Sequence, residues 1–337
     1  MKVKHKIWAG VAGGAAVAWG VRAWLRSRRR IELSGRVVIV TGGSTGLGLM
    51  VARMAAQRGA SVVIAARGEE NLRAAEDELR ELGGEVLAVP TDVSDEGQVR
   101  TLVARTIERF GRVDILVNNA GTIQVGPAQA MNRDDFEKAM ATNFWGELHA
   151  ILAVLPQMRA QGGGRIANVV SVGGKVSVPH LLPYSASKFA LTGLTEGLRA
   201  ELARDNILVT GIYPGTIRTG GHTHAEFKGD RNAEYTWFAL SDTVPGISTS
   251  AESCARELWE AVLNGDPEVV VGWNARLVVF AHHLFPGWMT EAFSLINRAL
   301  PSGGENHGPS VRGEDLTGKV PETLNRLIPH GARPQQV

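Results

Sequence analysis

Cysteine is nearly absent from this chain, because Cys254 is the only one in 337 residues. A single thiol excludes an intramolecular disulfide, which fits a reducing compartment without proving one. The formal net charge is only +2, and the bases gather at one end. Residues 1–36 hold nine Lys and Arg against one acid, which leaves 27 bases against 33 acids in the rest. This mildly acidic body argues against an extended basic face of the kind that binds nucleic acid.

Long apolar runs are also scarce, and the one that stands out is Ile7–Leu25, an Ala- and Gly-rich stretch interrupted by Arg22. A helix of this length spans about 28 Å, close to the roughly 30 Å of a bilayer core. The basic cluster Arg26–Arg30 places more positive charge after the stretch than before it. We therefore expect residues 1–30 to form an uncleaved, single-pass membrane anchor, with the rest of the chain in the cytoplasm. A cleaved signal peptide and a basic amphipathic helix on the membrane surface are the alternatives.

From residue 31 to residue 272 the sequence alternates between short apolar runs and helical patterns. Val37–Val40 is a β-branched run typical of a buried parallel strand, and a helical pattern up to Gln57 follows it. Further strands are predicted near 61–65, 85–89, 113–117, 165–170 and 207–212, and helices near 69–82, 96–110, 134–158 and around Tyr184. This alternation predicts an α/β fold with a doubly wound parallel sheet, a Rossmann fold, in one domain.

A glycine-rich turn, Thr41-Gly-Gly-Ser-Thr-Gly-Leu-Gly48, stands at the first predicted strand-to-helix junction. Glycines at this place let the backbone approach a pyrophosphate, and the helix N-terminus offers N–H groups and the positive end of its dipole. The turn therefore predicts a dinucleotide site.

A second motif is Tyr184-Ser-Ala-Ser-Lys188, with Ser171 thirteen residues upstream of the tyrosine. Residues four apart on a helix lie on one face, one turn from each other. An ammonium beside a phenol favours the phenolate, so such a tyrosine can give or take a proton at a carbonyl or alcohol oxygen. The pair alone is weak evidence, and its weight comes from the motifs upstream of it.

Taken in order, these motifs resemble the short-chain dehydrogenase/reductase family, in the branch with a T-G-x-x-x-G-x-G turn. The resemblance covers about 70% of the chain, from about Gly35 to Gly272. The matching elements are Thr41 to Gly48, Asp92, Asn118-Asn119-Ala120-Gly121, Asn143, Ser171 with Tyr184 and Lys188, and Pro214 to Thr219. The resemblance implies an enzyme that interconverts C=O and CH–OH groups with a nicotinamide cofactor.

The resemblance also implies four catalytic residues. Tyr184 is the expected general acid in reduction and general base in oxidation, with Lys188 favouring its phenolate and binding the ribose hydroxyls. Ser171 is expected to position the substrate oxygen, and Asn143 to hold a water that links Lys188 to solvent. The implied cofactor contacts, besides Tyr184 and Lys188, are Thr41, Gly42, Ser44, Thr45, Gly46, Leu47, Gly48, Arg67, Asp92, Val93, Asn119, Ala120, Gly121, Pro214, Gly215, Ile217 and Thr219.

An acidic residue is missing where the second predicted strand ends. In this fold an Asp or Glu at that place binds the ribose 2′-OH and repels a 2′-phosphate, whereas this chain has Ala66 followed by Arg67. A guanidinium can bind a phosphate through two hydrogen bonds. We therefore expect NADP(H) to be preferred and NAD(H) to be possible, although Thr45 is neutral where some NADP-dependent relatives carry a basic residue.

Residues 220–250 fall where the family has its variable substrate lid, and they contain Phe227, Tyr235, Trp237 and Phe238. These aromatic side chains favour an apolar substrate. His222 and His224 stand two apart with no acid or cysteine cluster beside them, so we expect surface residues and no metal site.

Two segments follow residue 272. Residues 273–300 form an apolar, aromatic, helical pattern interrupted at Pro286. We expect them to pack on the body or against a second copy, or to contact a membrane beside the active-site mouth. Residues 301–337 are rich in Gly, Pro and polar residues and are expected to form a flexible tail with little packed structure.

The leading hypothesis is an NADP(H)-dependent oxidoreductase that acts on a small apolar, lipid-like carbonyl or alcohol. A β-ketoacyl-type reductase working on a carrier-bound chain is the alternative among enzymes. A membrane-tethered nucleotide-binding scaffold without turnover is a third hypothesis, which the intact set of Asn143, Ser171, Tyr184 and Lys188 argues against. The resemblance further implies a homodimer or homotetramer formed through the long helices.

Overall fold

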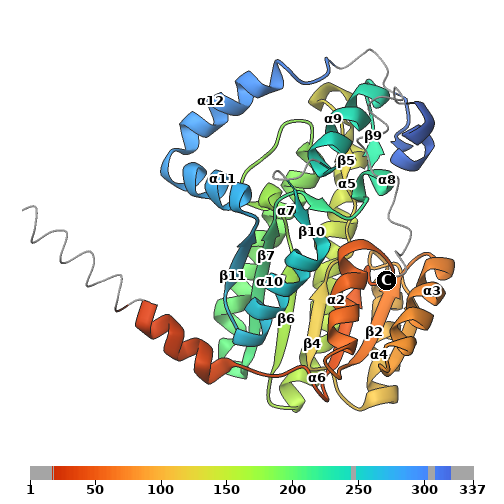
Figure 1. Cartoon of the computed structure of the whole chain (residues 1–337), viewed down its shortest axis with the longest axis vertical. Coiled ribbons are helices and arrows are strands. Elements are labelled where there is room, and N and C mark those ends of the chain that lie inside the picture. The colour runs from red at the N-terminus through yellow and green to blue at the C-terminus, as the bar shows by residue number, and fades with distance from the viewer. Residues whose placement is uncertain (1–16, 18, 244–247, 303–307, 320–337) are drawn as a thin grey trace, which may run out of the picture.

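Seven parallel strands form one sheet through the middle of the molecule (Figure 1). The computed structural model describes residues 17, 19–243, 248–302 and 308–319. The strand order is β11 (Glu268–Val271), β7 (Ile207–Pro214), β6 (Gly164–Val169), β4 (Ile115–Asn118), β1 (Val37–Thr41), β2 (Ser61–Ala66) and β3 (Val86–Pro90). Every neighbouring pair in this sheet is parallel. The predicted doubly wound α/β fold is therefore confirmed.

Helices cover both faces of the sheet. One face carries α2 (Gly46–Ala56), α3 (Glu69–Glu81) and α10 (Ala251–Asn264), and the other carries α4 (Glu96–Phe110), α6 (Gly146–Ala160) and α7 (Leu182–Glu201). Alternate side chains of a strand point to opposite faces, so Val38 packs in the first cluster and Ile39 in the second. Because both faces are buried, the strands consist of continuous apolar runs.

The carboxyl ends of the central strands meet at one edge of the sheet, where folds of this kind bind ligands. β1 leads into the glycine-rich turn, β4 into Asn119, and β6 toward Ser171. The register keeps these ends level, since Val40 pairs with Val117 and Asn118 pairs with Asn168. Motifs that the sequence spreads over residues 41–219 therefore come together at this edge.

The helix predicted over residues 134–158 consists of three segments, α5 (Arg133–Met140), the π-helical turn η2 (Ala141–Trp145) and α6. Asn132 caps α5 in a reciprocal capping box with Asp135. The π-helical turn contains Asn143, whose side chain is fully buried. Turns of this kind occur frequently at functional sites, and here the wide turn lies directly beside the carboxyl edge of the sheet.

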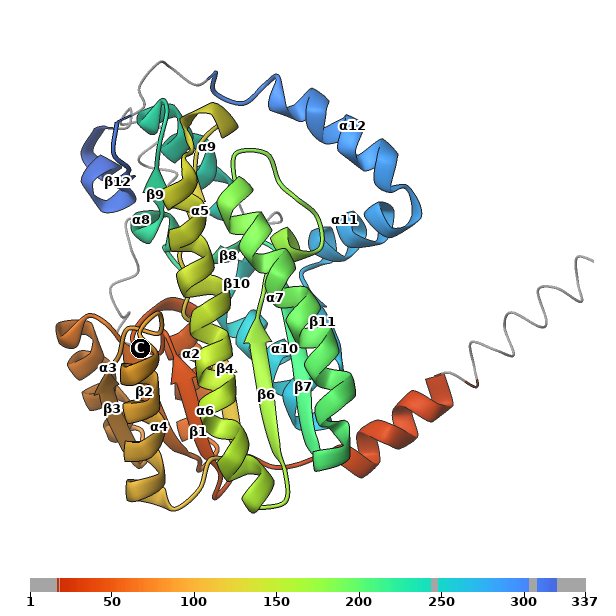
Figure 2. The ribbon, with the colours of Figure 1, turned by 180° about the vertical axis from the view of Figure 1, so that it is seen from behind.

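A smaller layer covers the carboxyl edge, and we call it the lid layer (Figures 1 and 2). It holds two short sheets, β8 (Ile217–Arg218) with β10 (Thr249–Ser250), and β5 (Gln124–Val125) with β9 (Glu226–Phe227) and β12 (Val311–Arg312). It also contains α8 (Gly221–His224), α9 (Arg231–Thr243) and the turn η5 (Gly313–Lys319). Phe227, Tyr235 and Leu316 form its core.

The C-terminal segment differs from the flexible tail expected over residues 301–337. Residues 308–319 are packed in the lid layer through β12 and η5, and Leu316 is 3% exposed. The packing of residues 308–319 could not be predicted from the sequence, because β12 is only two residues long and too short to show the alternation of a strand. Residues 303–307 and 320–337 lie outside the described part of the chain.

The predicted single-pass anchor is wrong, because none of the helices in the described residues is long and apolar enough to cross a membrane. Residues 1–16 and 18 of the predicted anchor lie outside that description. Residues 19–29 are helical, and this helix is held to the body by ion pairs. Arg26 lies 3.0 Å from Glu260 and 3.3 Å from Asp266, and Arg22 lies 3.7 Å from Asp266. Charged side chains that pair with the body make this end of the segment polar.

The apolar segment after residue 272 forms two helices, α11 (Trp273–Leu284) and α12 (Pro286–Asn297), with Pro286 at the start of the second as its fixed φ allows. Every residue of α12 lies in the described part, and none is buried. The expectation that this segment packs on the body therefore fails for α12, which extends away from the main sheet in Figure 1. The exposed large side chains are Trp273, Leu277, Phe280, Leu284, Phe285, Trp288, Leu295 and Ile296.

Candidate active site

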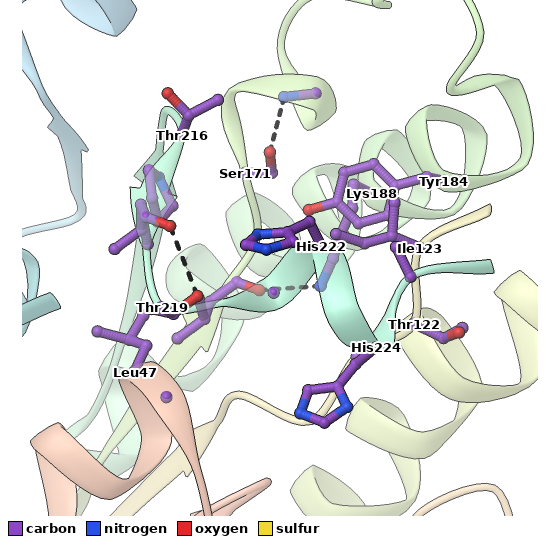
Figure 3. A pocket seen from close by; sticks show the side chains of 18 of the residues that line it. Leu47, Thr122, Ile123, Ser171, Tyr184, Lys188, Thr216, Thr219, His222 and His224 are labelled. Atoms are coloured by element: carbon purple, nitrogen blue, oxygen red, sulfur yellow. Dashed lines mark hydrogen bonds between the residues drawn. The ribbon is translucent and has the colours of Figure 1, made fainter. Parts of the chain in front are cut away.

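A cavity of about 510 Å³ lies between the carboxyl edge of the main sheet and the lid layer (Figure 3). The glycine-rich turn and the residues that follow β4, β6 and β7 line one side of it, and α8 and α9 line the other. Ser171, Tyr184 and Lys188 all face this space. The three side chains that the sequence motif joins therefore share one cavity.

Tyr184 and Ser171 meet around Gly173 in the turn η3 (Val172–Gly174). A Cβ atom built on Gly173 would lie 3.2 Å from a ring carbon of Tyr184 and 3.4 Å from the hydroxyl oxygen of Ser171. The backbone N–H of Gly173 donates to Ser171 Oγ at 3.0 Å, which leaves the hydroxyl proton of Ser171 to donate elsewhere. Figure 3 shows the hydroxyl of Tyr184 directed into the cavity.

Lys188 lies one turn after Tyr184 on α7 and is only 3% exposed. Its ammonium donates to the carbonyl oxygen of Val169 at 2.9 Å and to Glu147 Oε1 at 3.2 Å. Glu147 was not among the residues predicted from the sequence. It follows Asn143 by four residues, and this spacing was the available signal that both face the same side of the helix.

The carboxyl group of Glu147 is buried beside Lys188, and no described residue hydrogen-bonds to its second oxygen, Oε2. Burial raises the pKa of Glu147 to about 8, even though the Lys188 ammonium acts in the opposite direction. Removal from water disfavours the charged form of a carboxyl group. Here the hydration lost by Glu147 outweighs the attraction of the Lys188 ammonium. The group next to Lys188 therefore titrates near neutral pH.

Asn143 ties η2 to the segment that follows β4. Its Nδ2 donates to the carbonyl of Thr122 and to Ser187 Oγ, both at 3.0 Å, and its Oδ1 accepts from the N–H of Thr122 at 2.8 Å. A Cβ on Gly121 would lie 3.3 Å from Asn143 Oδ1 and 4.0 Å from Lys188 Nζ, so both polar groups border the backbone at Gly121. The role of Asn143 in a water relay stays a prediction, and its direct bonds fix the backbone that borders the cavity.

The glycine-rich turn forms a close-packed cradle in front of α2. Gly42 has a φ of +62°, and a Cβ there would lie 2.9 Å from the Cα of Ala120, so the turn requires glycine at this position. A Cβ on Gly48 would lie 2.1 Å from the carbonyl oxygen of Gly42. Within the described residues, the first turn of α2 has no side-chain cap, which leaves its N–H groups for an anion. The cradle therefore fits the pyrophosphate of a dinucleotide.

A second cavity of about 270 Å³ adjoins the first and shares part of the glycine-rich turn with it. The residues expected to contact the adenosine half of a cofactor, Arg67, Asp92 and Val93, line it. Three further lining residues, His224, Glu226 and Arg312, come from the lid layer and were not foreseen. No local pattern marks them, because the pairing of β12 with β9 brings together residues far apart in the chain.

Most of the expected cofactor contacts line one or both cavities: Gly42, Ser44, Thr45, Gly46, Leu47, Arg67, Asp92, Val93, Asn119, Ala120, Gly121, Tyr184, Lys188, Pro214, Gly215, Ile217 and Thr219. Thr41 and Gly48 line neither of them. Thr41 Oγ1 instead accepts the backbone N–H groups of Asn119 and Ala120, at 3.0 and 3.1 Å. Thr41 and Gly48 therefore hold the backbone of the cradle in place without lining a cavity.

His222 is not the surface residue that the sequence indicated, because it is only 1% exposed and lines the larger cavity. Its ring packs edge-on against Tyr235 with 5.9 Å between centroids. The short helix α8 turns it inward, under the C-terminal segment. His224 is exposed and lines both cavities. Among the described residues, no group of three or more His, Cys, Asp and Glu is placed to hold a metal ion.

Comparison with known proteins agrees with this geometry. Residues 36–228, more than half of the chain, match the family model described as short chain dehydrogenase. The chain belongs to this family and is an oxidoreductase.

Among curated relatives, a putative ketoacyl reductase of Streptomyces coelicolor is 41% identical over 185 residues, which cover 54% of this chain and 71% of the relative. Among solved structures, a short-chain dehydrogenase/reductase from Burkholderia phymatum in complex with NAD is 27% identical, with a TM-score of 0.71 over 77% of this chain and 96% of that one. A gluconate 5-dehydrogenase from Burkholderia cenocepacia in complex with NADP and tartrate is 30% identical, with a TM-score of 0.64 over 74% and 98%. The two structures hold different nicotinamide cofactors, so the likeness supports the cofactor class and leaves the choice between NAD and NADP to the residues of this chain.

Proposed function

We propose that this protein is an NADP(H)-dependent oxidoreductase that interconverts a carbonyl and an alcohol on an apolar, lipid-like substrate. The observation that carries the proposal is the convergence of Ser171, Tyr184 and Lys188 on one cavity that also contains the glycine-rich cradle. Proton-transfer groups and a nucleotide cradle are thus within reach of one substrate.

Each side chain has a role that its chemistry allows. In reduction, the Tyr184 hydroxyl gives its proton to the substrate carbonyl oxygen, and in oxidation the phenolate takes a proton from the alcohol. Ser171 accepts from the N–H of Gly173, so its own proton is free to donate to the same substrate oxygen and hold it in place. Lys188, one turn further along α7, lines the same cavity and is assigned to the ribose hydroxyls of the cofactor. The nicotinamide cofactor, when bound, supplies or accepts the hydride.

The preference for NADP(H) rests on the end of β2. Ala66 ends the strand, and the exposed side chain of Arg67 lines the second cavity. An alanine offers no charge to repel a 2′-phosphate, and a guanidinium can bind one through two hydrogen bonds. This charge pattern supports NADP(H) over NAD(H).

The apolar substrate is supported by the walls of the larger cavity, which include Val178, Leu181, Trp237 and Phe238. Trp237 is held in place because its Nε1 donates to the buried Glu234 at 2.6 Å. Glu234 in turn lies 2.8 Å from His180 Nδ1. A fixed aromatic wall of this kind recognises an apolar group by shape and contact.

The relative named as a ketoacyl reductase favours a second candidate, reduction of a β-ketoacyl chain held on a carrier. The two candidates use the same proton-transfer residues and differ in whether the substrate is free or attached to a carrier. Comparing kcat/KM for a carrier-bound β-ketoacyl thioester with that for a free ketone of equal chain length separates them. A preference of tenfold or more for the carrier-bound form would favour the second candidate.

The test of the main proposal is NADPH oxidation against carbonyl compounds of increasing chain length and ring number. Tyr184→Phe is expected to abolish turnover while leaving the Kd for NADPH nearly unchanged, because it removes one hydroxyl and no cradle residue. Tyr213→Phe is the matched control, since Tyr213 is buried on β7 and lines neither cavity. Undiminished turnover in Tyr184→Phe would contradict the mechanism, and kcat/KM that does not rise with apolar size would contradict the substrate class.

The predicted homodimer or homotetramer stays a proposal. It is supported by large exposed apolar side chains on the helices of one face, among them Phe136 on α5, Leu152 on α6 and Phe189 on α7. Burial of such side chains against a second copy would remove them from water. Sedimentation equilibrium of the full chain measures the state directly, and a monomer at micromolar concentration would contradict the proposal.

A further inference from the structure

The second cavity is bordered by a residue from the far end of the chain. Arg312, on β12, lines it together with Arg67, which follows β2. The two guanidinium groups come from different layers of the molecule, one from the main sheet and one from the lid layer. In Figure 2, β12 lies beside β9, above α3 and β2.

The position of Arg312 is set by packed structure. β12 pairs antiparallel with β9, with Val311 opposite Phe227 and Arg312 opposite Glu226. Leu316, four residues further on, is buried in the core of the lid layer. The backbone at Arg312 is therefore held on both sides, by the pairing with β9 and by the buried Leu316, which fixes where its side chain begins.

Gly313 draws the backbone of this segment close to α8. Its N–H donates to the carbonyl oxygen of Ala225 at 2.9 Å. A Cβ on Gly313 would lie 2.0 Å from the carbonyl oxygen of His222, so no larger residue fits without a shift. His222 lines the larger cavity. Residues 308–316 thus lie across the part of the lid layer that faces both cavities, and we call them the C-terminal strap.

The charges around the second cavity leave Arg312 available to an anion. Glu226, the nearest acid in the sheet register, is engaged by Lys138 and accepts from Ser310 Oγ at 2.9 Å. Arg312 pairs with Glu314 at 3.3 Å, but the two side chains are 61% and 51% exposed. Pairs this exposed are weak, so the guanidinium can exchange Glu314 for a phosphate, which it binds through two charge-assisted hydrogen bonds.

We infer that Arg312 is a phosphate-binding residue of the nucleotide site, contributed by the C-terminal strap and acting together with Arg67. The inference rests on the proposed nicotinamide cofactor. The chemistry recognised is a phosphate, either the pyrophosphate that NADP(H) and NAD(H) share or the 2′-phosphate that only NADP(H) carries.

The test is equilibrium binding of NADPH and of NADH to the full chain, by isothermal titration calorimetry, with no substrate and no turnover. Arg312→Gln is expected to raise the Kd for NADPH about tenfold, the loss of one charge-assisted contact. An equal rise for NADH assigns Arg312 to the pyrophosphate, and a rise for NADPH alone assigns it to the 2′-phosphate. Arg298→Gln, at the end of α12 and outside both cavities, is the matched control and is expected to bind like the wild type.

The outcomes separate the inference from the function it rests on. Wild-type protein that binds NADPH, together with an Arg312→Gln variant of the same Kd, would overturn the role of Arg312 and leave the proposed cofactor intact. Wild-type protein that binds neither nucleotide would overturn both. If Arg312→Gln does not fold, Arg312→Lys serves in its place, because it keeps the charge and loses the two-pronged geometry. A smaller rise in Kd is then expected, and no rise would overturn the inference.

Discussion

Replacing Glu147 by glutamine tests whether this buried carboxyl group carries a proton near neutral pH. Glutamine keeps the size of the side chain and an oxygen that can accept from Lys188, but it cannot ionise. The pKa of Glu147 in the folded protein is about 8, against an ordinary value of 4.5. Between these two values the folded state holds one proton more than the unfolded state. The free energy of unfolding of the wild type must therefore fall as the pH rises through this window.

The magnitude follows from proton linkage. One extra proton in the folded state changes the free energy of unfolding by about 1.4 kcal/mol for each pH unit. From pH 5.5 to pH 7.5 the wild type is therefore expected to lose about 3 kcal/mol relative to Glu147→Gln. The two proteins should have similar stability near pH 4, below the ordinary value of 4.5, where the carboxyl is neutral in both states and resembles the amide.

Urea unfolding at pH 5.5, 6.5 and 7.5 measures this difference. Glu201→Gln is the control, since Glu201 is exposed at the end of α7 and should follow the wild type at every pH. A stability difference between Glu147→Gln and the wild type that stays constant with pH would refute the reasoning. Above about pH 8 the carboxylate of Glu147 forms and offsets the charge of Lys188, so kcat/KM of the wild type is expected to fall behind that of the variant there.

Three further substitutions test the cradle, the cofactor choice and the lid layer. Ala66→Asp is expected to raise the KM for NADPH at least tenfold with little change for NADH, because it places a negative charge where a 2′-phosphate would lie; equal KM changes for both would contradict the charge argument. Gly42→Ala is expected to lower the free energy of unfolding by about 1–3 kcal/mol and to weaken nucleotide binding, because of the positive φ and the 2.9 Å approach to Ala120; wild-type stability by urea unfolding would show that the turn relaxes. Leu316→Ala is expected to cost about 2–5 kcal/mol, and an unchanged Tm would mean that the strap is not part of the cooperative core.

The main sheet was predictable because its signals are local. A strand buried on both faces has a continuous run of apolar residues, and Val37–Val40 is such a run. The structure has β1 at Val37–Thr41. The helix predicted over residues 96–110 agrees with α4 at both ends. Asp95 accepts from the N–H groups of Gly97 and Gln98 at its start, and Gly111 takes the left-handed conformation at its end. Helix caps, turns and strands buried on both faces all depend on residues that are close together in the sequence, so the sequence predicts them.

The lid layer was less predictable because its order comes from long-range pairing. β9 and β12 are two residues each and are joined across some 85 positions of sequence. His222 was expected at the surface because no acid or cysteine cluster stands beside the two histidines. The structure buries it where Gly313 of the C-terminal strap approaches its backbone. No window of the sequence contains both partners, so no periodicity could reveal the contact.

The residues of the site likewise fall into those marked by a local sequence motif and those brought to the site only by the fold. The proposed carbonyl–alcohol interconversion uses a phenol, an ammonium and a hydroxyl close to one another, and helix geometry gives the pair Tyr184 and Lys188 a fixed spacing. Nothing in the reaction requires a carboxyl group against the ammonium or a guanidinium from the C-terminus. Glu147 and Arg312 therefore belong to no motif. The spacing from Asn143 indicates the side of the helix on which Glu147 lies, but only the fold shows that it contacts Lys188 and that Arg312 lines the second cavity. The residues proposed to set the pH range and the cofactor affinity of this enzyme therefore lie outside its motifs.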